Sequence, residues 1–352
     1  MFYLCNMKKW ILIWICLLPV FAVAQPPAGY YDAAEGLSGS ALKIALHNII
    51  SAGFVSTSYD GLWDVYPTTD NKPNGKVWDM YSDIPGGTAP YEFTFVTDQC
   101  GNYSAEGDCY NREHTVPQSW FSSSSPMVSD IFQVVPTDGK VNGQRGDLPY
   151  GEVGTANWTS LNGSKRGTCD FPGYTGTVFE PIDSFKGDFA RIYFYMCVRY
   201  KDEMPSWTGE SFSSGDLSTW TENMLLQWHA LDPVSTKEID RNNDVFGIQH
   251  NRNPFVDNPD WVYSIWGPTA GMETDFQQYI SVFPNPADET MNIRYTTSER
   301  PENVFLCDLQ GRVIAEVTSE NQIETINIPE GFYFLKFIFK NGIAEKEFVI
   351  MH

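Results

Sequence analysis

The spacing of apolar residues changes near residue 280, and this change most constrains how the chain folds. Before it, apolar positions recur at helical intervals in several long segments, separated by loops rich in Gly, Pro and Asp. After it, apolar and polar residues alternate between turns at Gly311, Gly331 and Gly342, a pattern typical of about four to six short antiparallel strands. A chain of 352 residues also exceeds the size at which single cores usually stop growing. We therefore expect an α+β fold of two domains, the second a small all-β sandwich.

The N-terminus has the pattern of a cleaved export signal. Two lysines precede an apolar run, residues 10–23, and a small-x-small sequence ends at Ala24. The alternative is a transmembrane anchor, but the run is short for one and a cleavage pattern ends it. We expect a signal peptide at residues 1–24 and no stable membrane span after its removal, with the mature chain beginning at Gln25.

The net charge of the chain is −21. A strongly acidic balance excludes a protein that coats nucleic acid through bulk attraction to phosphate. It leaves open an enzyme that meets phosphate at one local site with the help of a metal ion.

Five of the seven cysteines remain after removal of the signal. An exported protein can form disulfides, and Cys100 and Cys109 are the best local pair because the Gly-rich loop between them could close. The odd number leaves at least one thiol unpaired.

Helical spacing indicates a helix over residues 42–54 and a helix buried on more than one face over residues 183–200. Two further helices are expected on either side of Asp232-Pro233, since Asp-Pro is a natural break. Residues 76–83 and 91–96 are interpreted as short strands.

The segment NREHTVPQSWF places Glu113 and His114 side by side, shortly before Pro117. A glutamate offers a hard oxygen ligand for Mg²⁺, and a histidine can take a proton from water near neutral pH. Neighbouring side chains in a strand point to opposite faces. Both residues therefore reach one site only if the strand bends, or else the metal and the base lie on two sides of a substrate group.

A second set of polar residues follows in PTDGKVNGQRGD. Thr137 or Asp138 could cap a helix that starts there. On that helix the amide oxygen of Asn142 would be a second hard ligand, leaving coordination positions for water and a substrate phosphate. Arg145, at spacing three, would project from nearly the same face and could clamp a phosphate. From the residues alone, the catalytic interpretation competes with an ordinary surface Glu-His pair.

Four segments taken together resemble the bacterial endonuclease I family, a branch of the His-Me finger (ββα-metal) nucleases: NREHTVPQSWF, PTDGKVNGQRGDLPYGEV, GDFARIYFYMCVRY and RNNDVFGIQHNRNPFVD. The resemblance covers residues 42–266 in the same order. It implies a ββα-metal core within a nuclease domain at residues 25–270. His114 would be the general base, and Glu113 and Asn142 would hold Mg²⁺, with Mn²⁺ and Ca²⁺ as alternatives. Arg145 as a phosphate contact is an inference from spacing.

The sequence departs from the family at three positions. Members usually carry histidine in the segment that matches SDIFQVVPTDG, where this chain has Phe132 and Gln133, and Asn258 stands where a histidine is common. These departures motivate an alternative, a catalytically inactive surface protein that binds nucleic acid or matrix. The intact trio of Glu113, His114 and Asn142 favours a working nuclease.

The C-terminal segment, residues 280–352, resembles the type A sorting domain of the type IX secretion system. The resemblance rests on VFPNPADETMNI, DLQGRVI and PEGFYFLKF. It implies contact with the type IX machinery and passage across the outer membrane of a Gram-negative bacterium to the surface or the medium. The stretch before it, residues 271–279, is interpreted as a linker. A generic β-sandwich that binds carbohydrate is the alternative.

The remaining polar residues are given structural interpretations. His229 and His250 are expected to be packing or surface residues. Arg191, Tyr195 and Arg199 share a helix face, which we interpret as an exposed stripe, with contact to a nucleic-acid backbone as the alternative. Taken together, the sequence predicts a secreted, metal-dependent endonuclease of low sequence preference that acts on DNA, with RNA left open. The basic residues nearest the predicted site are Arg112, Lys140, Arg145, Lys165 and Arg166.

Overall fold

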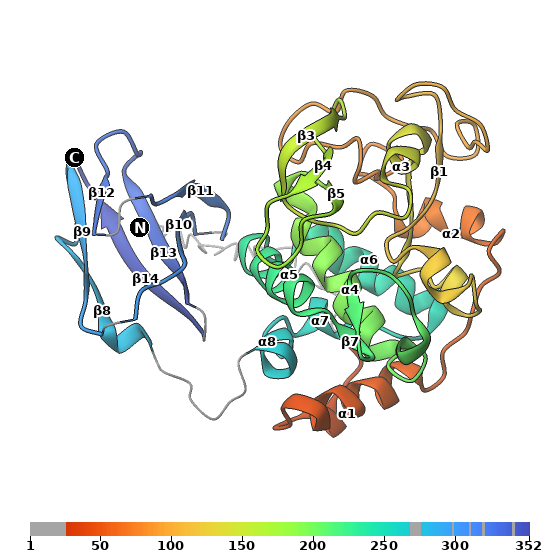
Figure 1. Cartoon of the computed structure of the whole chain (residues 1–352), viewed down its shortest axis with the longest axis horizontal. Helices are drawn as coiled ribbons and strands as arrows, with labels where there is room; N and C mark the ends of the chain where they lie inside the picture. The colour runs from red at the N-terminus through yellow and green to blue at the C-terminus, as the bar shows by residue number, and fades with distance from the viewer. Residues whose placement is uncertain (1–25, 268–275, 298, 310, 319–320, 340–341) are drawn as a thin grey trace, which may run out of the picture.

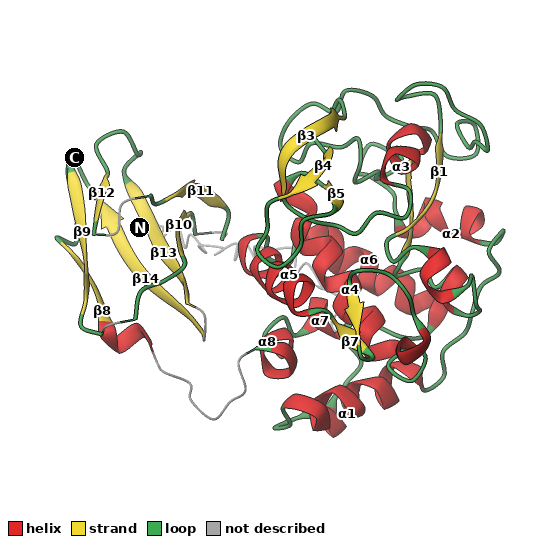
Figure 2. Ribbon diagram, viewed as in Figure 1, coloured by secondary structure: helices red, strands yellow, loops and turns green. Residues whose placement is uncertain are grey.

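The computed structural model describes residues 26–267, 276–297, 299–309, 311–318, 321–339 and 342–352. The predicted signal peptide and most of the predicted linker lie outside these residues. Helices and short sheets alternate as far as Trp266, and the chain after residue 276 is built almost entirely from antiparallel strands (Figures 1 and 2). The predicted α+β class is confirmed.

Helices provide most of the buried surface of the first domain. Helix α4 runs through its centre (Figure 2), and 13 of its 14 residues are buried, which confirms the helix predicted over residues 183–200. The chain break at Asp232-Pro233 is also confirmed. The α-helices are α1 (Gly39–Ser51), α2 (Leu62–Thr69), α3 (Gly139–Arg145), α4 (Lys186–Arg199), α5 (Thr219–Leu231), α6 (Thr236–Gln249), α7 (Pro254–Asp257) and α8 (Trp261–Trp266).

The predicted exposed stripe on α4 is wrong. Arg191 is fully buried, and its Nη2 donates to Oε2 of Glu238 at 2.8 Å. Tyr195 is equally buried and donates its hydroxyl to Asp130 at 2.8 Å. Spacing along one helix cannot reveal partners that lie far away in sequence, so buried ion pairs of this kind escape a pattern analysis.

Short sheets surround these helices. The strands of the first domain are β1 (Tyr110–His114), β2 (Val134–Asp138), β3 (Val153–Thr159), β4 (Lys165–Cys169), β5 (Thr177–Glu180), β6 (Phe212–Ser213) and β7 (Asp216–Leu217). The strands predicted over residues 76–83 and 91–96 are not formed. These segments run as turns and loops joined by a hydrogen bond from Val77 N to Phe93 O at 3.0 Å. Four of their apolar residues are buried in the core, namely Val77, Met80, Tyr81 and Phe93.

Strands β1 and β2 and helix α3 form a compact unit, called here the hairpin-helix motif. The strands pair antiparallel, with His114 opposite Val134 and Tyr110 opposite Asp138. Helix α3 follows β2 directly because Asp138 caps it, accepting a hydrogen bond from Val141 N at 2.8 Å. The predicted helix start is confirmed. The motif has the ββα arrangement that the family resemblance implied.

The second domain is an antiparallel β-sandwich with its own core. Its sheets have the strand orders β11-β10-β13-β14 and β12-β9-β8. The strands outnumber the four to six predicted, and β13 and β14 are nine residues long. They are β8 (Ile280–Phe283), β9 (Thr290–Tyr295), β10 (Asn303–Cys307), β11 (Val313–Glu316), β12 (Gln322–Glu324), β13 (Gly331–Phe339) and β14 (Gly342–Ile350).

None of the helices in the described part of the chain combines the length and apolar character that a membrane crossing requires.

Candidate active site

Strand β1 presents two chemically different faces. Asn111 and Glu113 contact residues of α3, whereas Arg112 and His114 contact Tyr59 on the other side. This alternation follows from the two-residue period of a strand. Glu113 and His114 therefore leave the strand on opposite faces, which agrees with the second of the two arrangements that the sequence allowed.

His114 is the last residue of β1 and is buried. Its Nε2 lies 3.0 Å from the main-chain oxygen of Val128. A carbonyl oxygen only accepts hydrogen bonds, so Nε2 carries the proton, and Nδ1 of the neutral ring keeps its lone pair. Burial, together with the charges of Arg145 and Arg112, lowers the pKa of His114 to about 4 against the effect of this hydrogen bond. The ring is therefore a neutral proton acceptor at physiological pH.

Glu113 is buried beneath the strand. Its Oε1 accepts hydrogen bonds from the hydroxyl of Tyr81 at 2.8 Å and from Nη1 of Arg145 at 2.9 Å. The Tyr81 hydroxyl is also 2.7 Å from that of Tyr150. Burial raises the pKa of Glu113, and the charge of Arg145 opposes this rise. Both of these hydrogen bonds end on Oε1, and the Tyr150 hydroxyl is a further hydrogen-bond partner of the carboxylate.

Arg145 does not have the place predicted for it. Its side chain is 1% exposed, and its guanidinium donates to Glu113, to the main-chain oxygen of His114 at 2.6 Å and to that of Thr115 at 2.5 Å. A guanidinium enclosed in this way is not available to clamp a phosphate. The helical spacing suggested that Arg145 shares a face with Asn142, but it carried no information on how deeply the Arg145 side chain is buried. Arg145 instead fastens α3 to the end of β1.

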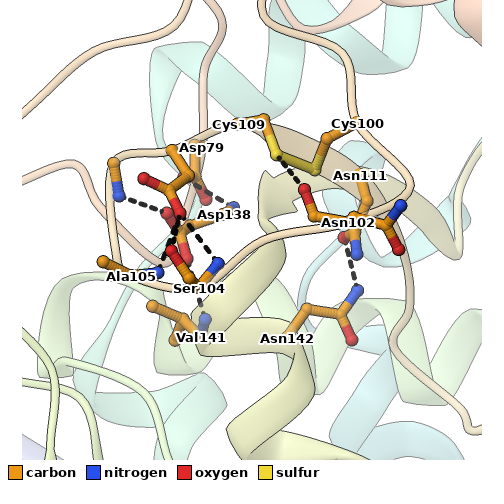
Figure 3. The surroundings of a disulfide bond; sticks show 12 residues. Asp79, Cys100, Asn102, Ser104, Ala105, Cys109, Asn111, Asp138, Val141 and Asn142 are labelled. Carbon is orange, nitrogen blue, oxygen red and sulfur yellow. Dashed lines mark hydrogen bonds between the residues drawn. A yellow bond between two sulfur atoms is a disulfide. The ribbon is translucent and has the colours of Figure 1, made fainter.

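Asn142 lies on α3 at the edge of the same interface. Its Nδ2 donates to Oδ1 of Asn111 at 2.7 Å and approaches the main-chain oxygen of Arg112 at 3.4 Å. Because a main-chain oxygen is only an acceptor, the amide must present its nitrogen to the strand. Figure 3 shows the nitrogen of Asn142 directed at Asn111 and its oxygen turned the other way. That oxygen accepts no hydrogen bond from the described residues.

These donors fit a hard divalent cation. Glu113 offers a carboxylate, which accepts from Tyr81 and Arg145 and has the Tyr150 hydroxyl as a further hydrogen-bond partner, and Asn142 offers an amide oxygen. Mg²⁺ favours oxygen ligands and usually retains waters or substrate oxygens beside one or two protein groups. Over the described ranges, no group of three or more His, Cys, Asp and Glu side chains is arranged to hold a metal ion. A site of one carboxylate and one amide is not such a group, because it has fewer side chains and includes an asparagine.

A buried carboxylate connects the elements that carry these ligands. Oδ1 of Asp79 accepts from Tyr81 N at 2.8 Å, and Oδ2 accepts from Asp138 N at 2.9 Å. Tyr81 holds Glu113, and Asp138 caps the helix that carries Asn142. Burial, together with the neighbouring charge of Asp138, raises the pKa of Asp79 to about 7. Asp79 was not singled out from the sequence, because a lone aspartate in a loop gives no signal of its long-range partners.

The loop that precedes β1 also packs against the helix. Cys100 and Cys109 form the predicted disulfide (Figure 3). Gly107 N donates to Oδ2 of Asp138 at 2.8 Å. Gly139, the first residue of α3, donates its N–H to the main-chain oxygen of Cys109 at 3.0 Å. The disulfide loop thus fixes the start of both β1 and α3.

At the three positions where the sequence departs from the family, the residues present have structural roles. Phe132 is buried, with its ring 4.7 Å from that of Tyr195. Gln133 is also buried, donates to the main-chain oxygen of Met127 at 2.5 Å and accepts from Val116 N at 3.3 Å. Asn258 ends α7. His229 is a packing residue and His250 lies on the surface, as predicted.

Tyr59, Tyr81 and Tyr150 surround the site and were not anticipated. They come from loops far from NREHTVPQSWF, so no local spacing connects them to it. Asn111 could have been found, because residues two apart in a strand share a face and Asn111 precedes Glu113 by two.

Comparison with known proteins gives matches to both parts of the chain. Residues 38–260 match the endonuclease I family. An extracellular ribonuclease of Bacillus amyloliquefaciens is 34% identical over 261 residues, which covers 70% of this chain and 81% of the relative. That of Bacillus subtilis is 34% identical over 268 residues, covering 71% and 83%. An endonuclease-1 of Buchnera aphidicola is 30% identical over 129 residues, covering 36% and 46%.

Residues 281–351 match the secretion system C-terminal sorting domain, and they include all but the first residue of β8 and the whole of the other strands of the sandwich. This match supports a secreted or surface location and contact with the type IX secretion machinery.

The hairpin-helix motif therefore lies inside a region that matches one family throughout and that is shared with two relatives over most of their length. The chain belongs to the endonuclease I family and is a nuclease that hydrolyses phosphodiester bonds.

Proposed function

We propose that this chain is an exported, metal-dependent nuclease that cuts both DNA and RNA with little sequence preference. The main support is the contact between Nε2 of His114 and the main-chain oxygen of Val128. It holds the imidazole in one tautomer and directs the proton-accepting Nδ1 away from the loop.

His114 is the general base in this proposal. Nδ1 takes a proton from the water that attacks the scissile phosphate, and the resulting imidazolium keeps its hydrogen bond to Val128. The low pKa of the ring ensures that Nδ1 is unprotonated before reaction. Arg145, fixed beneath the strand, opposes the rise in the pKa of Glu113 that burial causes.

Glu113 would hold the cation through its carboxylate, and Asn142 through its amide oxygen. Members of the endonuclease I family are generally metal-dependent. When bound, Mg²⁺ would polarise a phosphate oxygen and offset charge in the transition state. Because Glu113 and His114 leave β1 on opposite faces, the base and the residues that would hold the cation lie on different sides of the strand.

The choice of substrates rests on the relatives. Those with most of their length covered are named ribonucleases, and the shorter matches are named endonuclease-1. Recognition through the phosphate, rather than through base edges or the 2′-hydroxyl, suits a site that accepts both nucleic acids. Extracellular nucleic acid would then serve as a source of phosphate or nucleotides.

We further propose that the signal at residues 1–24 directs passage across the inner membrane of a Gram-negative cell. The C-terminal domain would then direct passage across the outer membrane.

The experiment that tests the enzymatic proposal uses plasmid DNA and a structured RNA as substrates, with Mg²⁺ in one series and EDTA in the other. The wild-type chain should cut both substrates only when Mg²⁺ is present, and His114→Ala should lose at least about a thousandfold in kcat. His250→Asn is the matched control, because His250 is exposed at the end of α6. Binding of DNA and RNA without cleavage under any divalent ion would instead support the inactive surface protein.

A further inference from the structure

Arg112 and His114 project from the same face of β1, two residues apart. Their proximity also appears in the charge of Arg112, which contributes to the low pKa of His114. Since Arg145 is enclosed on the other side of the strand, Arg112 is the arginine that shares the face of the proposed base.

One aromatic ring contacts both side chains. The Tyr59 ring is stacked on the His114 imidazole, with centroids 5.6 Å apart and planes inclined by 19°. The guanidinium carbon of Arg112 lies 3.6 Å from the centroid of the same Tyr59 ring. Trp63, in the first turn of α2, is the second ring beside Arg112, at 4.7 Å. Aromatic faces attract guanidinium groups, so these rings fix the position of Arg112 relative to His114.

The hydrogen bonds of Arg112 use only part of its guanidinium. Nη1 donates to the main-chain oxygen of Tyr59 at 2.6 Å and to the carboxylate of Asp60 at 3.2 Å. No hydrogen bond from Nε or Nη2 to another described residue is found. The Asp60 side chain is 93% exposed and that of Arg112 is 15% exposed. An ion pair with so exposed a partner is weak and is readily exchanged for a stronger anion.

We propose that Arg112 is a phosphate-binding residue for the nucleic-acid substrate and that Tyr59 holds it beside the base His114. The Asp60 carboxylate occupies the position of the substrate phosphate until substrate binds. The ligand is the phosphodiester backbone, because the rings cover the faces of the guanidinium and leave its N–H edge for a bidentate contact with oxygen. This inference rests on the proposed nuclease function and assigns one of its substrate contacts.

The test measures the cleavage kinetics of Arg112→Met at several salt concentrations, in the chain with both domains. KM should rise by about tenfold or more, as expected for a lost hydrogen bond to a charged group. The slope of log affinity against log salt should fall by about one, because one phosphate contact is gone. Arg312→Met is the matched control, since it breaks an exposed Arg–Asp pair in the second domain and should change neither quantity.

Two further variants separate this role from a structural one. Asp60→Asn removes the competing carboxylate and should lower KM, whereas Arg112→Lys keeps the charge and should retain the salt slope with a smaller rise in KM. Unchanged KM and salt slope in Arg112→Met, or an unchanged or raised KM in Asp60→Asn, would overturn the proposal. If Arg112→Met does not fold, the outcome for Asp60→Asn decides.

Substrate affinity measured in the His114→Ala background keeps the two hypotheses apart. If the wild-type chain does not cut, the nuclease function fails. The added Arg112→Met must even then weaken the binding of His114→Ala to DNA by about the factor expected for KM. If the wild type cuts and the added Arg112→Met leaves that binding unchanged, the function stands and the assignment of Arg112 fails.

Discussion

Nη1 of Arg145 lies 2.9 Å from Oε1 of Glu113, and the two side chains are only 1% and 3% exposed. A proposed metal ligand is therefore joined to a buried cation that also binds the main-chain oxygens of His114 and Thr115. The pair connects β1 and α3, so the shape of the site depends on it.

Removal of the Arg145 guanidinium should be costly. Arg145→Met would leave the Glu113 carboxylate buried without its counter-charge and free two main-chain oxygens, and we expect a loss of about 3–5 kcal/mol in the free energy of unfolding. Urea denaturation would measure it. Arg166→Met is a suitable comparison, because Arg166 is hydrogen-bonded to exposed Asn157 on the surface and its loss should cost less than about 0.5 kcal/mol. Equal losses in the two variants would contradict the role given to Arg145.

Asn142 can be tested through metal binding without any measurement of catalysis. Mg²⁺ should raise the midpoint of thermal unfolding of the wild-type chain, because a ligand that binds only the folded state stabilises it. Asn142→Ala should raise the Mg²⁺ concentration needed for half of this effect by about tenfold or more, and Asn111→Ala, which removes only the partner of the amide, should raise it less. A normal Mg²⁺ response in Asn142→Ala would remove Asn142 from the ligand set.

Gln133 holds the loop that orients the proposed base. Its amide donates to the main-chain oxygen of Met127, next to Val128, and accepts from Val116 N. Gln133→Ala would leave these buried groups unpaired at a cost of about 2 kcal/mol in the free energy of unfolding. It should also lower kcat, because the Val128 oxygen would no longer be fixed against His114. Gln118→Ala, at an exposed position nearby, is the control for both measurements. A stable Gln133→Ala variant with full kcat would show that the loop needs no such anchor.

Asp79 should make the free energy of unfolding depend on pH. The folded-state pKa of about 7 exceeds the unfolded value of about 3.9, so the folded chain binds more protons between these limits. The contribution of the protonated carboxyl to stability is complete below about pH 4 and is lost as the pH rises through 7, a difference of about 4 kcal/mol. Asp138, Tyr91 and Ser82 are the polar groups that face it.

Urea denaturation between pH 5 and pH 8 would measure this effect. The stability of Asp79→Asn relative to the wild type should rise with pH, since the variant lacks the ionisation that disfavours folding. Asp170→Asn, at an exposed position, should keep the wild-type profile. Parallel profiles for the wild type and Asp79→Asn would show that Asp79 does not titrate in this range.

Local signals in the sequence were sufficient for much of the fold. The cap at Asp138, the break at Asp232-Pro233 and the disulfide Cys100–Cys109 each depend on residues close together in the chain, and all three are confirmed. The strands predicted over residues 76–83 and 91–96 are not formed, because Val77, Met80, Tyr81 and Phe93 are buried in the core from turns and loops.

The site was predictable only in part. NREHTVPQSWF led to Glu113 and His114, whose structural positions are compatible with the roles proposed for them. Groups tens of residues away along the chain determine the burial of Arg145 and the contacts of Asp79 and Tyr59. Those long-range partners decide which polar residues are buried and which can meet substrate, and residue spacing does not encode them.

The two hydrophobic clusters share no residue. One draws its buried members from Tyr31 to Trp266, and the other from Phe276 to Ile350. A cut between Trp266 and Phe276 would therefore divide the chain without separating any two members of one cluster. Loss of the C-terminal domain by such a cut would leave the buried cluster of the nuclease domain complete.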